Sequence, residues 1–407
     1  METMNQNFPS KEPTGERETH PLGVYVHIPY CKQKCHYCAF ISSEPGVGGE
    51  IERYIQSVKK HVELGSKYCI GRWLESIYIG GGTPSFVGKQ NLVDLFQTLH
   101  DSFSLKKNAE ITVEVNPESA SASLFEALVA SGVNRISLGV QSFSDESLKR
   151  LGRIHNGQDV YDSVEHARKA GVAAVSMDLM FGLPGQSLNE WKDTLREATS
   201  FEPEHISVYG LGIEEGTPFY RWSQESKITT VVEETYVEMY HVAMELLKEA
   251  GYLHYEISNW CRPGQESRHN LLYWDRDDYL AFGVSAHGKY GGYRYAFIDD
   301  RVEYMELFNT RDWENQGLIP HVDLLKEEES IPRDAMASDA MIFGLRKRQG
   351  VSIRAFGQRF GYEPMDRWEA PIRKLEDRGL LQLKGGRLRL TQEALLISNE
   401  VFQEFLH

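Results

Sequence analysis

The stretch GVYVHIPYCKQKCHYCAF, residues 23–40, contains the strongest signal in this chain. Its first seven residues are apolar and β-branched, which predicts a buried strand. Cys31, Cys35 and Cys38 follow at once with the spacing C-x3-C-x2-C. Thiolates are the ligands that iron–sulfur clusters require. Three of them on one tight loop predict a cubane cluster whose fourth iron is open to a small molecule.

The spacing alone also allows a zinc site, with His36 or Cys69 as the fourth ligand. Structural zinc sites more often use two C-x2-C pairs, and the sequence has no second pair. Five cysteines in 407 residues are also too few for a disulfide framework. We therefore favour the cluster and keep zinc as the alternative.

Strand and helix patterns alternate after this stretch. Further strands are predicted at 76–82, 110–117, 134–142, 173–182 and 204–212, with helices at 51–64, 92–103, 123–132 and 160–171. This alternation predicts an α/β fold of parallel βαβ units. Ligand sites in such folds gather at the carboxyl ends of the strands, where the cysteines and the other unusual motifs lie.

The remainder of the chain is divided by composition. Residues 251–300, rich in Tyr, Gly and Trp, suggest an irregular functional segment, and a boundary is expected within 322–335. Residues 380–391 predict a hairpin around Gly385-Gly386, followed by a last helix over 393–406. Helices with such a β-wing suggest a winged-helix-like unit. The net charge of −15 argues against nucleic acid as a partner, so we expect this unit to pack against protein.

The first twenty residues are polar and mixed in charge. They lack the apolar core of a signal peptide, and their acidic residues argue against a mitochondrial presequence. No apolar run approaches the length needed to cross a bilayer. We expect a disordered tail over 1–20 in a cytoplasmic protein without a membrane span.

The pattern Y-x-H-I-P-Y-C-x3-C-x-Y-C-x-F, from Tyr25 to Phe40, resembles the signature of the radical S-adenosylmethionine (SAM) superfamily. It is similar above all to the branch with oxygen-independent coproporphyrinogen III oxidases and HemW-type heme chaperones. The resemblance implies a partial (β/α)6 barrel over 21–250, an accessory α+β region over 251–330 and the winged-helix-like unit over 331–407. It also implies a [4Fe–4S] cluster on Cys31, Cys35 and Cys38, with SAM on the open iron. An electron from the reduced cluster then cleaves SAM to a 5′-deoxyadenosyl radical and methionine, and a reductase or flavodoxin-type protein is the expected electron donor.

The resemblance continues at the ends of the later strands. Gly80-Gly81-Gly82-Thr83-Pro84 is similar to the element that contacts the amino group of SAM. The planar fork of an arginine suits the carboxylate of SAM, and an acidic side chain suits ribose hydroxyls. The SAM contacts implied by the resemblance are Tyr25, Tyr37, Gly81, Gly82, Thr83, Glu114, Gln141, Arg153, Asp178 and Gly212.

Two departures favour the HemW side of this branch. The oxidases carry a further cysteine two residues after the third, where this chain has Phe40, and their long N-terminal substrate region is missing here. The run His269, Asn270, Tyr273 and Trp274 resembles the H-N-x2-Y-W element associated with heme in that family. Imidazole is a common axial ligand of heme iron, which makes His269 the first choice, with His287 and Cys261 as further possibilities.

The predicted function is therefore a heme chaperone that binds heme and transfers it to an acceptor protein. The sequence does not decide whether the protein is also an enzyme. A radical SAM decarboxylase acting on coproporphyrinogen III is the alternative, and a zinc-binding interaction protein is a further one.

Overall fold

The computed structural model describes residues 21–310 and 324–406, so the expected tail over 1–20 lies outside it. A twelve-stranded sheet runs through the molecule in the order β12-β11-β10-β9-β1-β2-β3-β4-β5-β6-β8-β7. Six parallel neighbours form its centre: β1 (Leu22–Ile28), β2 (Trp73–Gly81), β3 (Ser104–Val115), β4 (Arg135–Gln141), β5 (Ala174–Phe181) and β6 (His205–Gly210). The strands predicted from the apolar runs are all confirmed.

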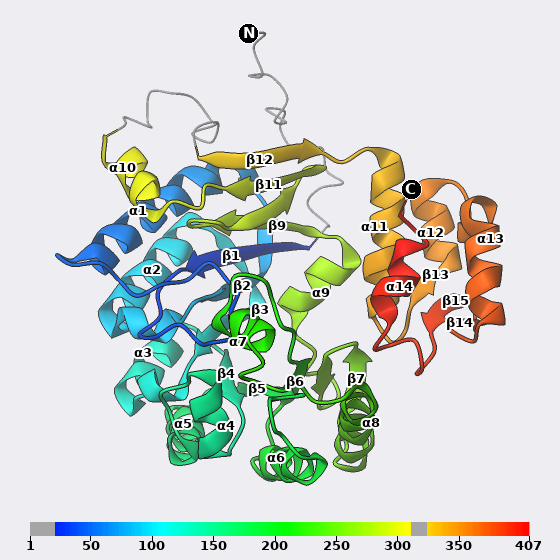
Figure 1. The fold of residues 1–407 in the computed structure, drawn as a ribbon. Helices are drawn as coiled ribbons and strands as arrows, with labels where there is room; N and C mark the ends of the chain where they lie inside the picture. The colour runs from blue at the N-terminus through cyan, green and yellow to red at the C-terminus, as the bar shows by residue number, and fades with distance from the viewer. Residues whose placement is uncertain (1–20, 311–323, 407) are drawn as a thin grey trace.

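Helices on the outer side of this sheet follow its curve (Figure 1). They are α1 (Glu50–Gly65), α2 (Lys89–Ser102), α3 (Ala122–Ala130), α4 (Asp145–Leu151), α5 (Gly157–Ala170), α6 (Leu188–Ser200) and α8 (Glu233–Glu249). Side chains cap several of them: Ser121, Asn156 and Ser187 each accept the N–H three residues on. The predicted alternation of strands and helices is thus confirmed as a parallel α/β core.

Residues 251–300 are more regular than the composition suggested. They extend the sheet at both ends, with β7 (Leu253–Glu256) and β8 (Asn259–Cys261) beyond β6. Beyond β1 follow β9 (Asp278–Phe282), which is parallel to β1, then antiparallel β10 (His287–Tyr290), β11 (Tyr293–Phe297) and β12 (Leu325–Ser330). The prediction of an irregular segment was wrong because aromatic residues such as Tyr290, Tyr295 and Phe297 are buried in this extension.

The C-terminal unit lies beside α9 (Arg268–Asp275) (Figure 1). It comprises α11 (Arg333–Arg346), β13 (Val351–Ser352), α12 (Ile353–Phe360), α13 (Pro364–Asp377), β14 (Leu381–Lys384), β15 (Arg387–Leu390) and α14 (Ser398–Gln403). The predicted hairpin is present, with Gly385 and Gly386 in the left-handed region that its turn requires. The last helix is shorter than predicted, because residues 391–397 form turns that bury Ala394 and Leu395.

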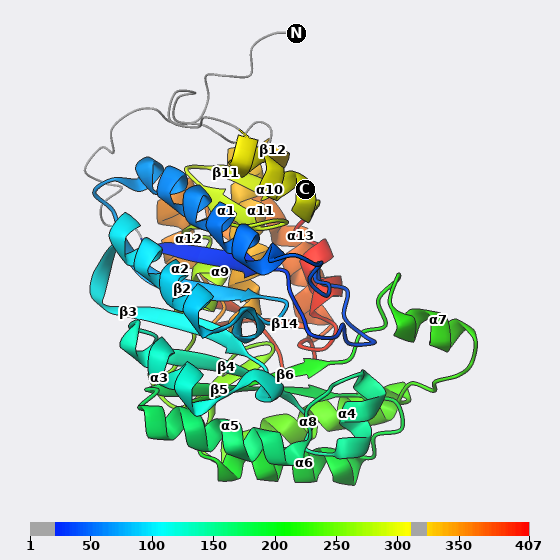
Figure 2. The ribbon, with the colours of Figure 1, turned by 90° about the vertical axis from the view of Figure 1, so that its left-hand side faces the viewer.

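Short helices complete the described part of the chain. These are the single-turn helices η2 (Ser66–Cys69), η3 (Pro84–Val87) and η4 (Pro117–Ser119), then α7 (Pro218–Gln224) and α10 (Arg301–Thr310). Figure 2 shows α7 at the same end of the sheet as α4 and the loop that follows β1. Among the described residues, no helix has the length and apolar character that crossing a membrane would need.

Candidate cluster and cofactor site

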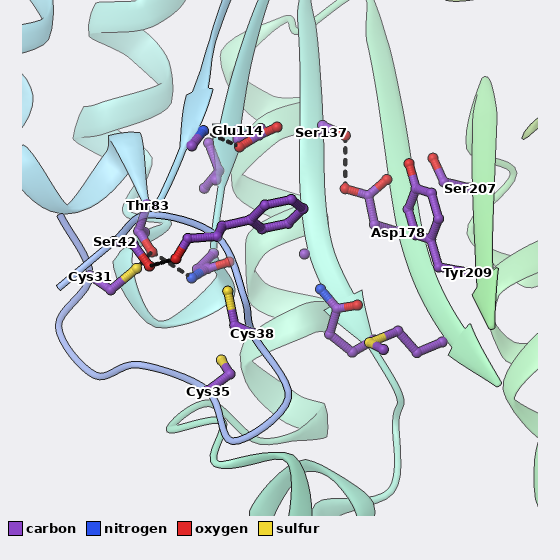
Figure 3. Close-up of a pocket in the computed structure, with 18 of the residues that line it drawn as sticks. Cys31, Cys35, Cys38, Ser42, Thr83, Glu114, Ser137, Asp178, Ser207 and Tyr209 are labelled. Carbon is purple, nitrogen blue, oxygen red and sulfur yellow. Dashed lines mark hydrogen bonds between the residues drawn. The ribbon is translucent and has the colours of Figure 1, made fainter. Parts of the chain in front are cut away.

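A cavity of about 560 Å³ opens at the carboxyl ends of the parallel strands. It is lined by all three cysteines of the loop after β1 and by residues that follow β2 to β6 (Figure 3). The residues expected to contact SAM that line it are Tyr37, Gly81, Gly82, Thr83, Glu114, Gln141, Arg153, Asp178 and Gly212. The fold therefore brings together side chains that are far apart in the sequence, as the position of each at a strand end predicted.

The cysteine loop is held from two sides. The backbone N–H of His36 donates to the carbonyl of Leu151 at the end of α4 (2.9 Å), and Phe219 in α7 donates to the carbonyl of His36 (3.0 Å). Thr83 Oγ1 donates to Cys31 Sγ at 3.5 Å. Burial raises the pKa of the thiols of Cys31 and Cys38. Iron would be needed to hold these sulfurs as thiolates, which agrees with a cluster site.

The loop does not assemble a site for a single metal ion. No three His, Cys, Asp or Glu side chains of the described residues converge closely enough to hold one. His36 points its Nδ1 at the carbonyl of Arg150, and Cys69 is buried elsewhere with its pKa raised to about 12. The donor set fits a cluster better than the zinc alternative.

The glycine-rich turn after β2 needs its glycines. A Cβ on Gly82 would lie 2.6 Å from the carbonyl oxygen of Tyr30 and 3.0 Å from Cys31 Sγ. Gly81 has a φ of 121°, which a side chain would strain. The absence of side chains thus lets this turn lie directly against the cysteine loop.

Glu114 at the end of β3 is a buried carboxyl with two donors. Tyr78 OH donates to its Oε1 (2.7 Å) and the backbone N–H of Gly81 donates to its Oε2 (2.9 Å). Burial raises its pKa to about 7, although these two hydrogen bonds act in the opposite direction. Its negative form would be stabilised by a cationic ligand such as an ammonium group.

Arg153 follows α4 and points back to the cluster loop. Its Nη1 donates to Cys35 Sγ at 3.7 Å, and its Nη2 donates to Asn116 Oδ1 and the carbonyl of Gly139, both at 2.8 Å. Burial alone would lower its pKa, but the charges of Cys35, Tyr37 and Glu118 together raise the pKa. The guanidinium is therefore a fixed positive charge beside the cysteines.

Several residues of this cavity escaped the sequence analysis. Ser137 donates to Asp178 Oδ2 at 2.9 Å, and burial raises the pKa of Asp178. The other lining residues not predicted include Tyr78, Asn116, Ser207 and Tyr209. Alternation along a strand was the available signal, because residues two apart face the same side. Ser207 and Tyr209 on β6 illustrate it, and Figure 3 shows both beside Asp178.

A second cavity of about 600 Å³ adjoins the first, and the two share Ala39, Phe40, Gly81 and Glu114. Tyr25 lines this second cavity and not the first, since its hydroxyl is bound to His27 Nδ1 (3.0 Å). Other lining residues are Tyr273, Trp274, Arg276, Tyr279, His287, Lys326 and Phe343. Its aromatic walls suit a flat apolar ligand.

The run expected to bind heme is divided by the fold. Tyr273 and Trp274 line the second cavity and Asn270 lines the first, whereas His269 lines neither. His269 is buried, with Nδ1 bound to Ser76 Oγ and Nε2 to Tyr273 OH, both at 2.8 Å. Burial lowers its pKa to about 3, so it is neutral. Cys261 is buried in β8 away from both cavities, and burial raises its pKa to about 12.

The C-terminal unit contacts the second cavity through Trp274. The indole stacks on Phe343 of α11 (ring centroids 6.1 Å apart, 18° between planes), and the Arg346 guanidinium lies 4.3 Å from its centroid. Its Nε1 is buried without a hydrogen-bond partner among the described residues. An unpaired buried donor is costly, and a ligand with an acceptor group would relieve that cost.

Comparisons with known proteins agree with this site. Residues 25–198 match the family model of the radical SAM superfamily, and residues 331–397 match that of the HemN C-terminal domain. The heme chaperone HemW of Bacillus subtilis is 34% identical over 94% of this chain and 98% of its own length. That of Escherichia coli is 40% identical over 66% of this chain and 70% of its own.

A solved structure shares the fold. Coproporphyrinogen III oxidase (HemN) of Escherichia coli, a radical SAM enzyme, aligns with a TM-score of 0.81 over 95% of this chain and 90% of its own. The identity is 21%, so this likeness supports the architecture and not the activity.

Proposed function

Because the chain belongs to the HemW family of the radical SAM superfamily, we propose that it is a heme chaperone that binds heme and passes it to an acceptor protein. The observation that carries the proposal is the similarity to HemW proteins over nearly the full length of both chains. The local sequence supports it, because Phe40 stands where the related oxidases carry a further cysteine.

We read the six parallel strands and their helices as the partial (β/α)6 barrel of the superfamily, spanning residues 21–250. Residues 251–330 are then an accessory region, and 331–407 a winged-helix-like domain. The match of the HemN C-terminal domain to 331–397 supports the last boundary. The small three-stranded sheet β13-β15-β14 supports the wing.

Cys31, Cys35 and Cys38 would hold the [4Fe–4S] cluster, and the first cavity would hold SAM. Bound together, these two groups supply one-electron chemistry. Glu114 would accept hydrogen bonds from the amino group of SAM, and Arg153 would donate to its carboxylate. Asp178 would accept from ribose hydroxyls, oriented by the donor Ser137. Tyr37 and Gly212 line the same cavity and would contact the adenine.

The second cavity would take the heme. Its aromatic residues supply apolar surface for the macrocycle, and Arg276 and Lys326 supply positive charge for the propionates. Tyr273 and Trp274 would form its wall on the side of α9, whereas Asn270 lines the first cavity and His269 lies behind Tyr273. The two cavities share Phe40 and Glu114, which supports a heme site next to the SAM site.

An anaerobic heme titration of the cluster-reconstituted protein, followed by absorbance, tests the proposal. We expect stoichiometric binding and transfer of the heme to an apo-acceptor protein. An assay for coproporphyrinogen III decarboxylation in parallel addresses the alternative of a radical SAM oxidase. Turnover of coproporphyrinogen without heme binding would replace the chaperone proposal. Protein that stays colourless on reconstitution with iron and sulfide would favour the zinc alternative.

We further propose a protein acceptor and a reductase or flavodoxin-type electron donor as partners, without nucleic acid, in the cytoplasm. The acidic net charge of −15 supports the exclusion of nucleic acid. Pull-down of the heme-loaded protein against candidate hemoproteins would identify the acceptor.

A further inference from the structure

His287 begins β10 at the second cavity and is held by a rigid neighbour. Its Nδ1 lies 2.9 Å from the carbonyl oxygen of Ser285. Ser285 is itself fixed, because its N–H donates to the carbonyl of Ile298 (2.9 Å) and its Oγ donates to Asp299 Oδ1 (2.8 Å). The imidazole is thus anchored through one of its two nitrogens.

That anchor determines the tautomer of His287. A carbonyl oxygen can only accept, so Nδ1 must carry the proton and donate it. In the neutral imidazole, Nε2 then carries the lone pair. Within the described residues, Nε2 has no hydrogen-bond partner, and the side chain is exposed where it lines the cavity. A backbone carbonyl that holds Nδ1–H and orients Nε2 is the arrangement found behind metal-ligating histidines.

The other histidines of this region are engaged at both nitrogens. His27 lines the same cavity, but its Nδ1 is bound to Tyr25 OH and its Nε2 to the carbonyl of Ile41, both at 3.0 Å. His269 is bound by Ser76 and Tyr273, as described above. Neither can coordinate iron without losing a buried hydrogen bond, which costs about 1–3 kcal/mol.

The surroundings of His287 suit a porphyrin. The walls carry Tyr273, Trp274, Tyr279 and Phe343, which are aromatic, and Phe40 at the boundary with the first cavity is 72% exposed. The unpaired Nε1 of Trp274 is a donor for a ligand carboxylate. The cavity therefore combines a free imidazole nitrogen, aromatic walls and an unused donor.

We propose that Nε2 of His287, and not His269, is the axial ligand of the heme in the second cavity. This inference rests on the proposed heme binding. Coordination needs only the lone pair of Nε2 and displacement of a weaker ligand from the iron, so no proton or electron is transferred. His269 is then a positioning residue, which holds the hydroxyl of Tyr273 beside the cavity.

The test compares three proteins in the anaerobic heme titration: the wild type, His287→Gly and His269→Gln. Difference spectra against the heme-free protein remove the cluster absorbance, and resonance Raman spectroscopy reports the iron–imidazole bond. We expect His287→Gly to lose the histidine-ligated spectrum and at least tenfold in affinity. Added imidazole should restore the spectrum, because it can fill the space of the missing side chain. His269→Gln should keep the ligated spectrum.

Each outcome is decisive. If the wild type binds heme and His287→Gly has an unchanged spectrum, the ligand assignment is wrong while the chaperone proposal stands. If only His269→Gln loses the histidine-ligated spectrum, His269 is the heme ligand and the assignment of His287 is wrong. If the wild type binds no heme, the proposed function fails, and the ligand assignment fails with it. Since His287 is exposed, its replacement is not expected to unfold the protein.

Discussion

The backbone N–H of Gly81 donates a 2.9 Å hydrogen bond to Oε2 of Glu114. This bond joins the glycine-rich turn after β2 to the end of β3, and Tyr78 donates to the other carboxylate oxygen. The carboxyl is nevertheless so deeply buried that its pKa rises to about 7. Burial thus destabilises its ionised form, and a cation bound beside the carboxylate would stabilise that form.

Replacing Glu114 by Gln should stabilise the fold at high pH. A folded-state pKa of about 7, above an ordinary value of 4.5, means that Glu114 lowers the stability as pH rises through this window. The free energy of unfolding of Glu114→Gln, relative to wild type, should therefore increase by about 3 kcal/mol from pH 4.5 to pH 8. Urea unfolding across pH measures it. A constant difference between the two proteins would contradict the buried titration.

The affinity for SAM should depend on the same group. Only ionised Glu114 attracts the positive charge of SAM, so the affinity for SAM should fall as pH drops below about 7, by up to tenfold per pH unit. Calorimetry on cluster-loaded protein between pH 5.5 and 8.5 measures this dependence. In Glu114→Gln the affinity should be weaker and the pH profile flat. A steep profile retained in the variant would assign the titration to another group.

Replacing Arg153 by Gln should lower the reduction potential of the cluster. The guanidinium 3.7 Å from Cys35 Sγ stabilises the more negative, reduced state. Its loss should shift the potential downward by about 50 mV, the equivalent of somewhat more than 1 kcal/mol for one electron. A redox titration followed by EPR gives the value. Arg150→Gln, whose Arg pairs with the exposed Glu146, is the control and should leave the potential unchanged.

Adding one methyl group at Gly139 should displace Arg153. The new Cβ would lie 2.7 Å from Asn116 Oδ1 and 3.1 Å from Arg153 Nη2. We expect Gly139→Ala to weaken SAM binding about tenfold. The displaced guanidinium of Arg153 would no longer align its N–H groups with the carboxylate oxygens of SAM. Gly357→Ala is the matched control, since its Cβ would meet only ordinary contacts of 3.7 Å or more. Equal SAM affinity of Gly139→Ala and wild type would exclude this role of Arg153.

Trp274 should couple the second cavity to the C-terminal unit. Trp274→Ala removes the stacking on Phe343 and the cation–π contact with Arg346, and should cost about 2–3 kcal/mol of stability. Trp274→Phe keeps an aromatic ring and should recover most of this stability. Chemical denaturation measures the stability of both variants. In a heme titration, the affinity should likewise be lower for Trp274→Ala than for Trp274→Phe. Similar losses in the two variants would argue against stacking as the cause.

Local sequence was sufficient to predict the six parallel strands and the cysteine loop. Each strand is predicted by a short β-branched run, and the cysteines lie close together because they share one short loop. The order of the predicted SAM contacts along the chain was also informative. Glu114, Gln141 and Asp178 lie in the carboxyl-terminal halves of three parallel strands, and Arg153 follows α4. Tyr25 stacks on Tyr78 (ring centroids 6.2 Å apart) but lines the second cavity, and the strand pattern does not encode which of two adjoining cavities a residue borders.

The sequence by itself thus determined the family and the cavity at the strand ends, and it predicts the cluster ligands, because these depend on local patterns and on parallel topology. Only the tertiary structure decided the state of the histidines. Ser76 binds His269 from 193 residues away in the chain, and no periodicity encodes that pairing. His287 keeps a free nitrogen because the carbonyl of Ser285 takes the other one. Hydrogen-bond partners, and not residue type, determine which imidazole can bind iron.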